Sequence, residues 1–470
     1  MVRDLLGKLL RPASGAEEAS SELPMKRVGP VAAIALLAEI EGPGGRELTA
    51  RVAAALDPCP GIEVRLANKR LRLPSDGNLI ERLAAAGATG RAWLAQEGAD
   101  VMIWGETTGL SGGAVLRFVP ALLDAEGKTG TFGLADALEL PANFGSEFGE
   151  ILGAATVAAA VPIKLGREES LGSVLSNAIA RVNGFVESPP MGLTAAQSAA
   201  MLACLGNCFA ALWRVNAKDA HLERAQRIYG LALHSCASPE LRLTRAMIQN
   251  HLAAVHEAKA AGDADPAHLE EAAKAYHAVA AALGPGEHPG DWAFAQTRLG
   301  LVLYRLALRR DSDAARMQAS VKAFEAAREV LDRDESPDRW AEVTNQMGVA
   351  LLALGSQVTG TDALERSVAC FREALGVRRR DAAPLLWAQT ANNLGAASFA
   401  LSRRKTVPGL LDEAVRCFEG AREIYLKYRQ PKVVAVIEKN LARVRERLSK
   451  GGKGEGRSPH RPGRSPRPRG

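Results

Sequence analysis

The chain has 470 residues, of which 47% are hydrophobic and only 5% aromatic, and it carries a formal net charge of +6. This length is too great for one hydrophobic core, so two or three folded units are expected, and few aromatic residues argue against a large all-β structure. Its six cysteines show no CxxC pair and no regular spacing, which argues against a disulfide framework or a zinc site and favours a reducing cytoplasm.

The first 27 residues are predicted to be a flexible segment. Arg3, Asp4 and Lys8 interrupt its apolar residues, so it does not form the apolar region of a secretory signal. Further along, Ile151–Ile163 is a charge-free apolar stretch of 13 residues, whereas a membrane-spanning helix needs about 20. We therefore expect a cytoplasmic protein with no transmembrane segment.

Residues 28–165 are predicted to form an α/β domain. Short apolar runs bounded by glycine, proline and polar residues indicate strands, and longer amphipathic stretches indicate helices. The order is strand, helix, strand, helix and then a three-stranded meander, which predicts a mixed sheet covered by helices. The expected elements are a strand at 31–37, a helix ending near Leu56, a strand at 62–66, a helix at 79–96, a strand at 101–106, and two strands in AVLRFVPALLDA and TGTFGLADALEL joined by the turn EGKTG.

The stretch GADVMIWGETTGLSGGAVLRFVPALLDAEGKTG resembles the N-terminal-type domain of TolB-like proteins. In that family an apolar strand ending in glycine leads into a hairpin, and a following strand ends in Asp, Ala and a turn. The resemblance implies a domain that in bacteria often precedes helical repeats, including in signalling proteins. It implies no catalytic residue.

Residues 166–193 are predicted to be a linker helix, a degenerate repeat or a cap. Helices are expected near 144–161 and 170–186, and Val182 lies 47 residues before Tyr229, in register with the repeats that follow. Pro189 and Pro190 end this helix. Thr194 and Gln197 then form a predicted capping box that opens the next one.

Residues 194–448 contain an internal repeat of 47 or 48 residues, which predicts five helical hairpins and a closing helix. The stretches WAFAQTRLG, WAEVTNQMG and WAQTANNLG repeat at this spacing, beginning at Trp292, Trp340 and Trp387. Small markers in the first helices are Gly206, Ala253, Gly300, Gly348, Gly395 and Ala442. Aromatic markers in the second helices are Tyr229, Tyr276, Phe324, Phe371 and Phe418. We expect each aromatic residue to enter the gap left by the small residues of its neighbour, and the tryptophans to serve packing rather than ligand stacking.

The succession of LG, then Ala, aromatic and Ala, as in Gly395, Ala414, Phe418 and Ala421, resembles the tetratricopeptide repeat. The usual period of that family is about 34 residues, whereas here the extra residues lengthen the loop inside each hairpin and the link between hairpins. The stretches WAQTANNLG and LLDEAVRCFEGA resemble a long-loop bacterial variant, which implies an interaction scaffold. The predicted fold class is therefore α+β and multidomain, an α/β domain with a mixed sheet followed by an all-α, TPR-like helical solenoid.

Catalytic and cofactor motifs were sought, and none is assigned. The glycines of GPGGRELT lack the Gly-Lys-Ser/Thr ending of a phosphate-binding loop, so a plain strand-to-helix turn is favoured. No HExxH motif occurs, and His251 and His256 are five residues apart, so they do not lie on one face of a helix. The histidines are therefore interpreted as solvated or capping residues. Cys370 and Cys417 precede equivalent aromatic residues and are interpreted as core residues. We predict a non-enzyme with no cofactor and no metal.

The candidate partner-binding residues lie on the first helices of the hairpins, which line the concave groove in the tetratricopeptide resemblance. Asn250, Asn345 and Asn392 each stand three residues before a small marker. Asparagine is a poor helix former, so its recurrence indicates that the amide is used, either for the backbone of an extended peptide or for the long loops. Gln389 and Phe399 extend the candidate groove.

Residues 449–470 form a basic tail that lacks large apolar residues and is predicted to be disordered. No aromatic residues interleave its charges, so any contact with polyanions is expected to be weak and non-specific, with no specific nucleic-acid binding. Two functions follow. The first is a protein-protein interaction scaffold that binds a partner protein or peptide in its groove, and the second is a regulatory sensor whose α/β domain binds a small ligand and whose repeats relay it.

Overall fold

The computed structural model describes residues 31–108, 112–122, 129–133, 135–160, 168–263, 265–309 and 313–452. The described residues form two compact units, 31–309 and 313–452. The predicted flexible segment (1–27) lies outside the described residues, as do residues 453–470 of the predicted basic tail and most of the predicted EGKTG turn.

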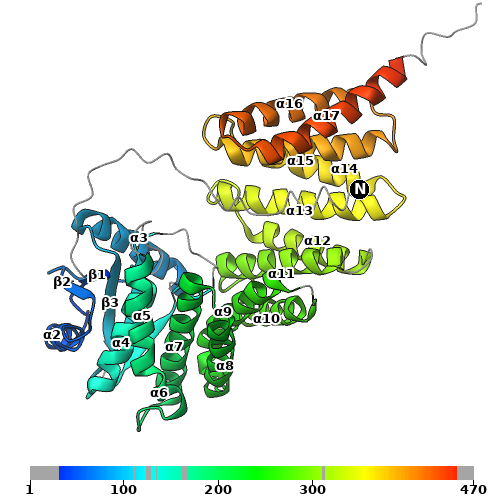
Figure 1. Cartoon of the computed structure of the whole chain (residues 1–470). Helices are drawn as coiled ribbons and strands as arrows, with labels where there is room; N and C mark the ends of the chain where they lie inside the picture. Colours follow the sequence, from blue (N-terminus) through cyan, green and yellow to red (C-terminus); the bar gives the residue numbers. More distant parts are fainter. Residues whose placement is uncertain are drawn as a thin grey trace, which may run out of the picture. The chain divides into compact units, whose positions relative to one another are not determined.

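The unit of residues 31–309 begins with a five-stranded mixed sheet (Figure 1). Its strand order is β2-β1-β3-β4-β5, with β1 parallel to both β2 and β3, and with antiparallel β3-β4 and β4-β5 pairs. The three-stranded meander and mixed sheet expected from the sequence are therefore confirmed. The strands are β1 (Ala33–Leu37), β2 (Ile62–Leu66), β3 (Val101–Thr108), β4 (Gly113–Pro120) and β5 (Ala137–Leu140).

Helices cover both faces of this sheet because alternate residues of its central strands point to opposite sides. Ile34 and Leu36 of β1 belong to one apolar cluster with Leu83 of α3 (Leu79–Glu97), whereas Ala35 and Leu37 belong to a second cluster with α2 (Gly45–Leu56) and α4 (Ser146–Ala159). Helix α3 begins with a capping box formed by Asn78 and Glu81, which satisfies two backbone N–H groups of the helix entry.

The second apolar cluster continues without interruption into the first helical hairpins. Helix α7 packs against both α4 and β5, and it also packs against its hairpin partner α8. Its entry has the predicted capping box, with Thr194 accepting from Gln197 N and Gln197 accepting from Thr194 N. The α/β domain and the hairpin α7–α8 therefore share one core.

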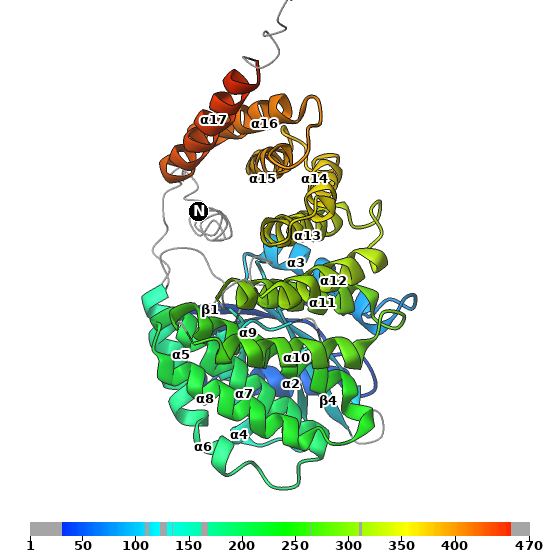
Figure 2. The same ribbon diagram turned by 90° about the vertical axis from the view of Figure 1, so that its right-hand side faces the viewer.

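Helices alternate in antiparallel pairs after the sheet, in the order that the repeat predicts (Figure 2). In the unit of residues 31–309 they are α5 (Glu168–Val182), the short α6 (Gly184–Glu187), α7 (Ala195–Asn216), α8 (Asp219–Ser235), α9 (Arg242–Gly262), α10 (Ala267–Leu283) and α11 (Pro289–Arg309), with a 3-10 turn at Pro239–Leu241. In the unit of residues 313–452 they are α12 (Ala314–Val330), α13 (Pro337–Gln357), α14 (Asp362–Leu375), α15 (Pro384–Ser402), α16 (Leu410–Lys427) and α17 (Pro431–Gly452). The expected helical-repeat architecture is observed, although α11 and α12, the predicted third hairpin, fall in different units.

Small and aromatic markers meet inside the hairpins as predicted. A Cβ added at Gly206 would lie 2.5 Å from the ring of Tyr229, one at Gly348 would lie 2.8 Å from Phe371, and one at Gly395 would lie 3.0 Å from Phe418. All five aromatic markers are no more than 1% exposed. The first helix of each of these three hairpins can therefore approach the second only because no side chain stands at the marker.

Among the described residues one helix, α7, is long and apolar enough to cross a membrane by length and composition alone. Its most apolar window is 78% buried inside the unit, as expected for a core helix that packs against a sheet and several helices. The apolar stretch of residues 151–163, considered above as a possible membrane span, is shorter than this core helix of 22 residues.

Candidate partner-binding face

The asparagines predicted to line a groove do not all lie on an open surface. Asn345 and Asn392 are each 1% exposed, which is at odds with a groove-lining role for these two side chains. Asn250, Gln389 and Phe399 are partly exposed. The Asn345 amide oxygen accepts a hydrogen bond from Asn393 Nδ2 at 3.4 Å, so this amide joins two neighbouring first helices.

The repeated tryptophans Trp292, Trp340 and Trp387 are partly buried. Trp292 is partly buried in an apolar cluster with residues of α9 and α10. The guanidinium of Arg333 lies 5.1 Å from the ring centroid of Trp340, and that of Arg380 lies 5.1 Å from Trp387. Each arginine precedes its tryptophan by seven residues, so this cation–π contact recurs with the repeat.

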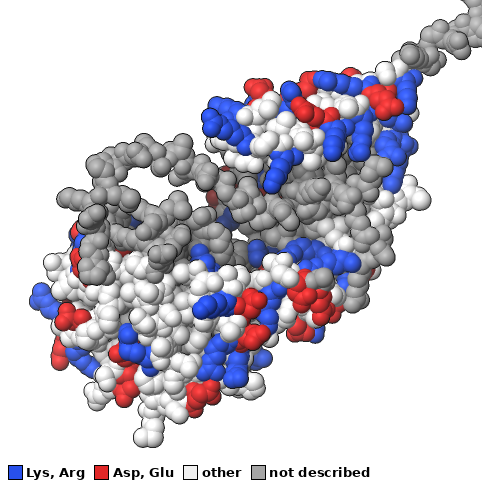
Figure 3. Space-filling view, viewed as in Figure 1, with Lys and Arg blue, Asp and Glu red and all other residues white. Residues whose placement is uncertain are grey.

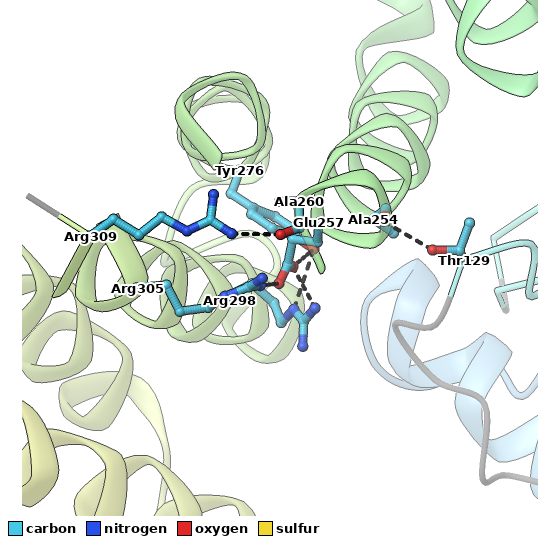
Figure 4. Close-up of polar contacts among 8 residues, drawn as sticks. All are labelled: Thr129, Ala254, Glu257, Ala260, Tyr276, Arg298, Arg305 and Arg309. Atoms are coloured by element: carbon cyan, nitrogen blue, oxygen red, sulfur yellow. Dashed lines mark hydrogen bonds and ion pairs between the residues drawn. The ribbon is translucent and has the colours of Figure 1, made fainter. Parts of the chain in front are cut away.

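A segment of irregular backbone contacts the first two hairpins. Residues 129–133 and 135–137, here called the strap, lead into β5 and contact α7 and α9. Thr129 Oγ1 donates to the Ala254 carbonyl at 2.9 Å (Figure 4). Gly130 lies so close to α7 that an added Cβ would be 2.2 Å from Ala211 N. Its φ of +75° also favours glycine at this position.

Asp136 is the centre of the strap's attachment. Its carboxylate accepts from Gly133 N at 2.6 Å, from Asn207 Nδ2 at 3.4 Å and from His251 Nε2 at 2.8 Å. Because a carboxylate only accepts, these contacts assign the imidazole proton to Nε2. Three donors from the strap, α7 and α9 therefore converge on one side chain.

Tyr229 completes this buried network. Its hydroxyl donates to Asn207 Oδ1 at 2.5 Å, and its ring stacks on His251 with centroids 5.7 Å apart. Burial, and secondarily the nearby Asp136 carboxylate, raises the pKa of the Tyr229 phenol well above its usual value. Asp136, Asn207, Tyr229 and His251 are each no more than 7% exposed, so these groups tie the strap to the helices rather than face a dissolved substrate.

The interpretation of the histidines as solvated or capping residues is wrong for two of them. His251 is 7% exposed and bonded to Asp136, and His256 is 6% exposed and lies 5.7 Å from His268, ring centroid to centroid. Helical spacing alone did not reveal this, because the partner of His251 lies 115 residues away in the chain.

The strap contacts follow one line along the first helices, here called the inner line. It consists of the positions two residues before, one residue after and five residues after the small marker, which share one side of a helix. In α7 these are Cys204, Asn207 and Ala211, and all three contact the strap, with Cys204 Sγ lying 3.6 Å from the Ala137 carbonyl. In α9, His251 and Ala254 do the same.

The position two residues before the marker was missed by the sequence analysis. In α9, α11, α13, α15 and α17 this position holds a polar residue, and these residues recur at the same spacing of 47 or 48 as the markers themselves. These residues are His251, Arg298, Gln346, Asn393 and Asn440. The signal was therefore present, but the recurrence of asparagine one position earlier obscured it.

In α11 the inner line is basic. It holds Arg298, Leu301 and Arg305, and both arginines point toward Glu257 of α9 (Figure 4). Glu257 also accepts from the Tyr276 hydroxyl at 2.8 Å. The side chains of Arg298 and Arg305 remain 27% and 34% exposed. One carboxylate thus neutralises only one of two guanidinium groups, which leaves donors for an anionic group.

Arg309 adds a third cation at the end of the same helix. It donates to the Ala260 carbonyl at 2.6 Å and to the Asp265 carbonyl at 2.7 Å. These acceptors are uncharged, so its positive charge adds to the excess on α11. Elsewhere on the face seen in Figure 3, basic and acidic side chains are interspersed over the helical repeats.

Within the described ranges, no group of three or more His, Cys, Asp or Glu side chains is placed to hold a metal ion. Burial raises the pKa of the Cys204 and Cys208 thiols above the usual value, which keeps them in the unreactive thiol form. Cys370 is 4% exposed, whereas Cys417 is only partly buried. These two cysteines occupy equivalent positions in α14 and α16.

His256 is expected to make the unit of residues 31–309 less stable in acid. Burial, followed by the neighbouring His268, lowers the pKa of His256 from its usual value of 6.5 to about 4. The unfolded chain therefore takes up the proton first, so this contribution is complete above pH ~6.5 and is lost as the pH falls towards 4. Between pH 7 and pH 5 we expect a loss of about 1–2 kcal/mol from this residue.

Urea unfolding of the protein and of His256→Leu at pH 7 and pH 5 measures this contribution. The free energy of unfolding of the unchanged protein should fall by about 1–2 kcal/mol more than that of His256→Leu between pH 7 and pH 5, because only the unchanged protein has His256. An identical pH dependence in both proteins would contradict the assignment.

Comparison with known proteins shows no match to a family model and no match among curated proteins. One solved structure that aligns with this chain is the crystal structure of BtubC (BKLC) from P. vanneervenii, at 17% sequence identity. The alignment covers 56% of this chain and 92% of that chain, with a TM-score of 0.40.

Proposed function

We propose that this protein is a non-catalytic scaffold that binds an extended, acidic segment of a partner protein along the inner line of α11. The observation that carries the proposal is the strap. Residues 129–133 and 135–137 show how an irregular segment of this same chain is held by the inner lines of α7 and α9, through contacts to backbone carbonyl groups and to one carboxylate.

The inner line of α11 continues this arrangement by one repeat. Where α9 has His251 to bind the carboxylate of Asp136, α11 has Arg298, and Arg305 lies seven residues further along the same side. Arginine suits a carboxylate better than histidine does, because its planar group can donate two parallel hydrogen bonds. A partner segment with Asp or Glu at a spacing of two or more residues fits this chemistry.

The family assignment and location are part of the same proposal. The 47-residue period and the small-to-aromatic packing support a long-loop tetratricopeptide-type repeat. A small α/β domain that precedes helical repeats accords with the TolB-like resemblance. A location in the reducing cytoplasm accords with the six cysteines, all of which are free.

The test is affinity capture from native cytosol with the full chain as bait. The variant Arg298→Gln with Arg305→Gln removes two cations from the inner line of α11 and keeps polar side chains of similar length. The control Lys322→Ala with Arg416→Ala removes two cations from exposed positions of second helices. We expect a specific partner with the unchanged bait and the control, and at least tenfold less with the α11 variant.

Binding of the recovered partner to the three proteins is then measured at low and high salt. A charged contact should weaken with salt in the unchanged bait and much less in the α11 variant. Equal recovery by all three folded baits, or no specific protein from any of them, would refute the proposal.

A further inference from the structure

The two edges of the sheet differ in their surroundings. Strand β5 packs against α7, and Cys204 Sγ of that helix lies 3.6 Å from the Ala137 carbonyl. Among the described residues, β2 ends the sheet on the other side (Figure 1). All five of its residues are at least partly exposed, and Leu66 is 54% exposed. An exposed edge strand of this kind can pair with a strand of another chain.

The backbone groups of β2 point alternately toward β1 and away from it. Strand β1 binds the Gly61 carbonyl at 3.0 Å and the Ala67 N–H at 2.9 Å, on either side of β2. The odd-numbered residues of this segment therefore face β1. Because the direction alternates along a strand, the N–H and C=O groups of Ile62, Val64 and Leu66 point to the outer side.

The sequence of β2, IEVRL, is self-complementary when two copies run antiparallel. With the two Val64 residues opposite each other, Ile62 faces Leu66 of the partner subunit, and Glu63 faces Arg65 of the partner subunit. This register uses the even-numbered residues, whose backbone groups point outward. Apolar residues then meet on one face of the joined sheet, and opposite charges meet on the other.

The neighbouring registers are unfavourable. Outward backbone groups require even-numbered residues to face even-numbered ones, so the nearest alternatives shift the pairing by two residues. One alternative places the two Glu63 side chains opposite each other, and the other does the same with Arg65. Like charges directly opposite each other destabilise a strand pair. The register centred on Val64 is therefore favoured over both.

Glu63 and Arg65 are accessible for contacts between two copies. Within one chain Arg65 Nε donates to Glu63 Oε1 at 2.7 Å, and the two side chains remain 41% and 38% exposed. Arg65 Nη1 also donates to the Glu97 carbonyl at 2.8 Å. Glu63 and Arg65 would form the closer, non-hydrogen-bonded type of antiparallel pair. Four charges of alternating sign would then lie together across the axis.

We propose that this protein forms a two-fold symmetric homodimer in which the β2 strands of two copies pair antiparallel around Val64. The two-fold axis requires the antiparallel arrangement, because both copies use the same surface. The Ile62 N–H already donates to the Cys59 carbonyl. The bonds between copies therefore run between the two Val64 residues and from each Leu66 N–H to an Ile62 carbonyl. A pair of five-residue strands buries little surface, so the dimer is reversible rather than permanent.

The test follows dimerisation of full-length proteins by sedimentation velocity over a range of concentrations. Glu63→Arg and Arg65→Glu each place like charges opposite each other in a homodimer. An equimolar mixture of these two variants brings opposite charges together again, and so does the double variant that carries both changes in one chain. Glu223→Arg, at an exposed position of α8, is the matched control for the change in net charge.

We expect the unchanged protein and the control to dimerise, and each single variant to dimerise at least tenfold more weakly. The mixture and the double variant should regain the dimer. Circular dichroism checks that the single variants remain folded. An unchanged protein that stays monomeric at every concentration would overturn the proposal. A dimer that both single variants form as tightly as the unchanged protein would also overturn it, by placing the interface elsewhere.

This inference does not rest on the proposed function at α11. Its measurements use no other protein, and the variants of the capture experiment leave β2 unchanged. Failure of one therefore leaves the other standing.

Discussion

Replacing Phe371 with alanine is expected to destabilise the unit of residues 313–452 by about 3–5 kcal/mol. The ring is 0% exposed and fills the space beside Gly348, so its removal leaves a cavity between α13 and α14. The rigid helices on either side can close this cavity only in part. Urea unfolding followed by circular dichroism measures the loss in the transition of this unit.

Two companion variants make the result specific. Leu386 is 45% exposed, so Leu386→Ala is expected to cost no more than about 0.5 kcal/mol. Gly348→Ala adds a Cβ only 2.8 Å from the Phe371 ring and is expected to cost about 1–3 kcal/mol by overpacking. If Phe371→Ala cost as little as Leu386→Ala, the pairing of small and aromatic markers would not be the basis of the hairpin.

The hairpins were predictable because their stabilising contacts are local in sequence. Gly348 and Phe371 lie 23 residues apart, and the same separation joins Gly395 to Phe418. Because successive hairpins use the same contact, its residues recur at a nearly fixed period in the sequence. Both ends of strand β2 were predicted correctly, because proline and glycine precede the strand and a polar loop follows it.

The attachment of the strap was not predictable in the same way. Asp136 and His251 are 115 residues apart, and no sequence motif around either residue predicts that they pair. Periodicity shows which side of a helix is shared, but it does not show what occupies that side. Asn345 and Asn392 illustrate the limit, since their recurrence was evident but their burial depends on neighbours that the period does not reveal.

Under the proposed function, the inner line would let one scaffold bind different ligands. Its geometry is common to the first helices because the marker fixes how each one packs on its partner helix. Its chemistry varies, from Cys204 and Asn207 in α7 through the basic line of α11 to the apolar line of α13. Repetition therefore supplies the position of the contact, and local substitution supplies its specificity.

Replacing Asp136 with alanine is expected to cost the unit of residues 31–309 about 3–5 kcal/mol, the loss typical of leaving the partners of a buried carboxylate without an acceptor. Three donors lose their acceptor at once, namely Gly133 N, Asn207 Nδ2 and His251 Nε2. None of them can reach solvent without moving the strap, because His251 and Asn207 are 7% and 0% exposed. Urea unfolding measures the loss, and faster proteolysis within residues 129–137 should accompany it.

A double-mutant cycle with His251→Ala separates this network from a general loss of packing. If Asp136 and His251 act together, the double variant should cost at least about 1 kcal/mol less than the two single variants added. Glu223→Ala, at an exposed position of α8, removes a carboxylate without a buried partner and should change stability by no more than about 0.5 kcal/mol. Strict additivity of the two single losses would show that Asp136 and His251 stabilise the fold separately. The strap would then be held by the approach of Gly130 to Ala211 and by the Thr129 hydroxyl on the Ala254 carbonyl rather than by this carboxylate.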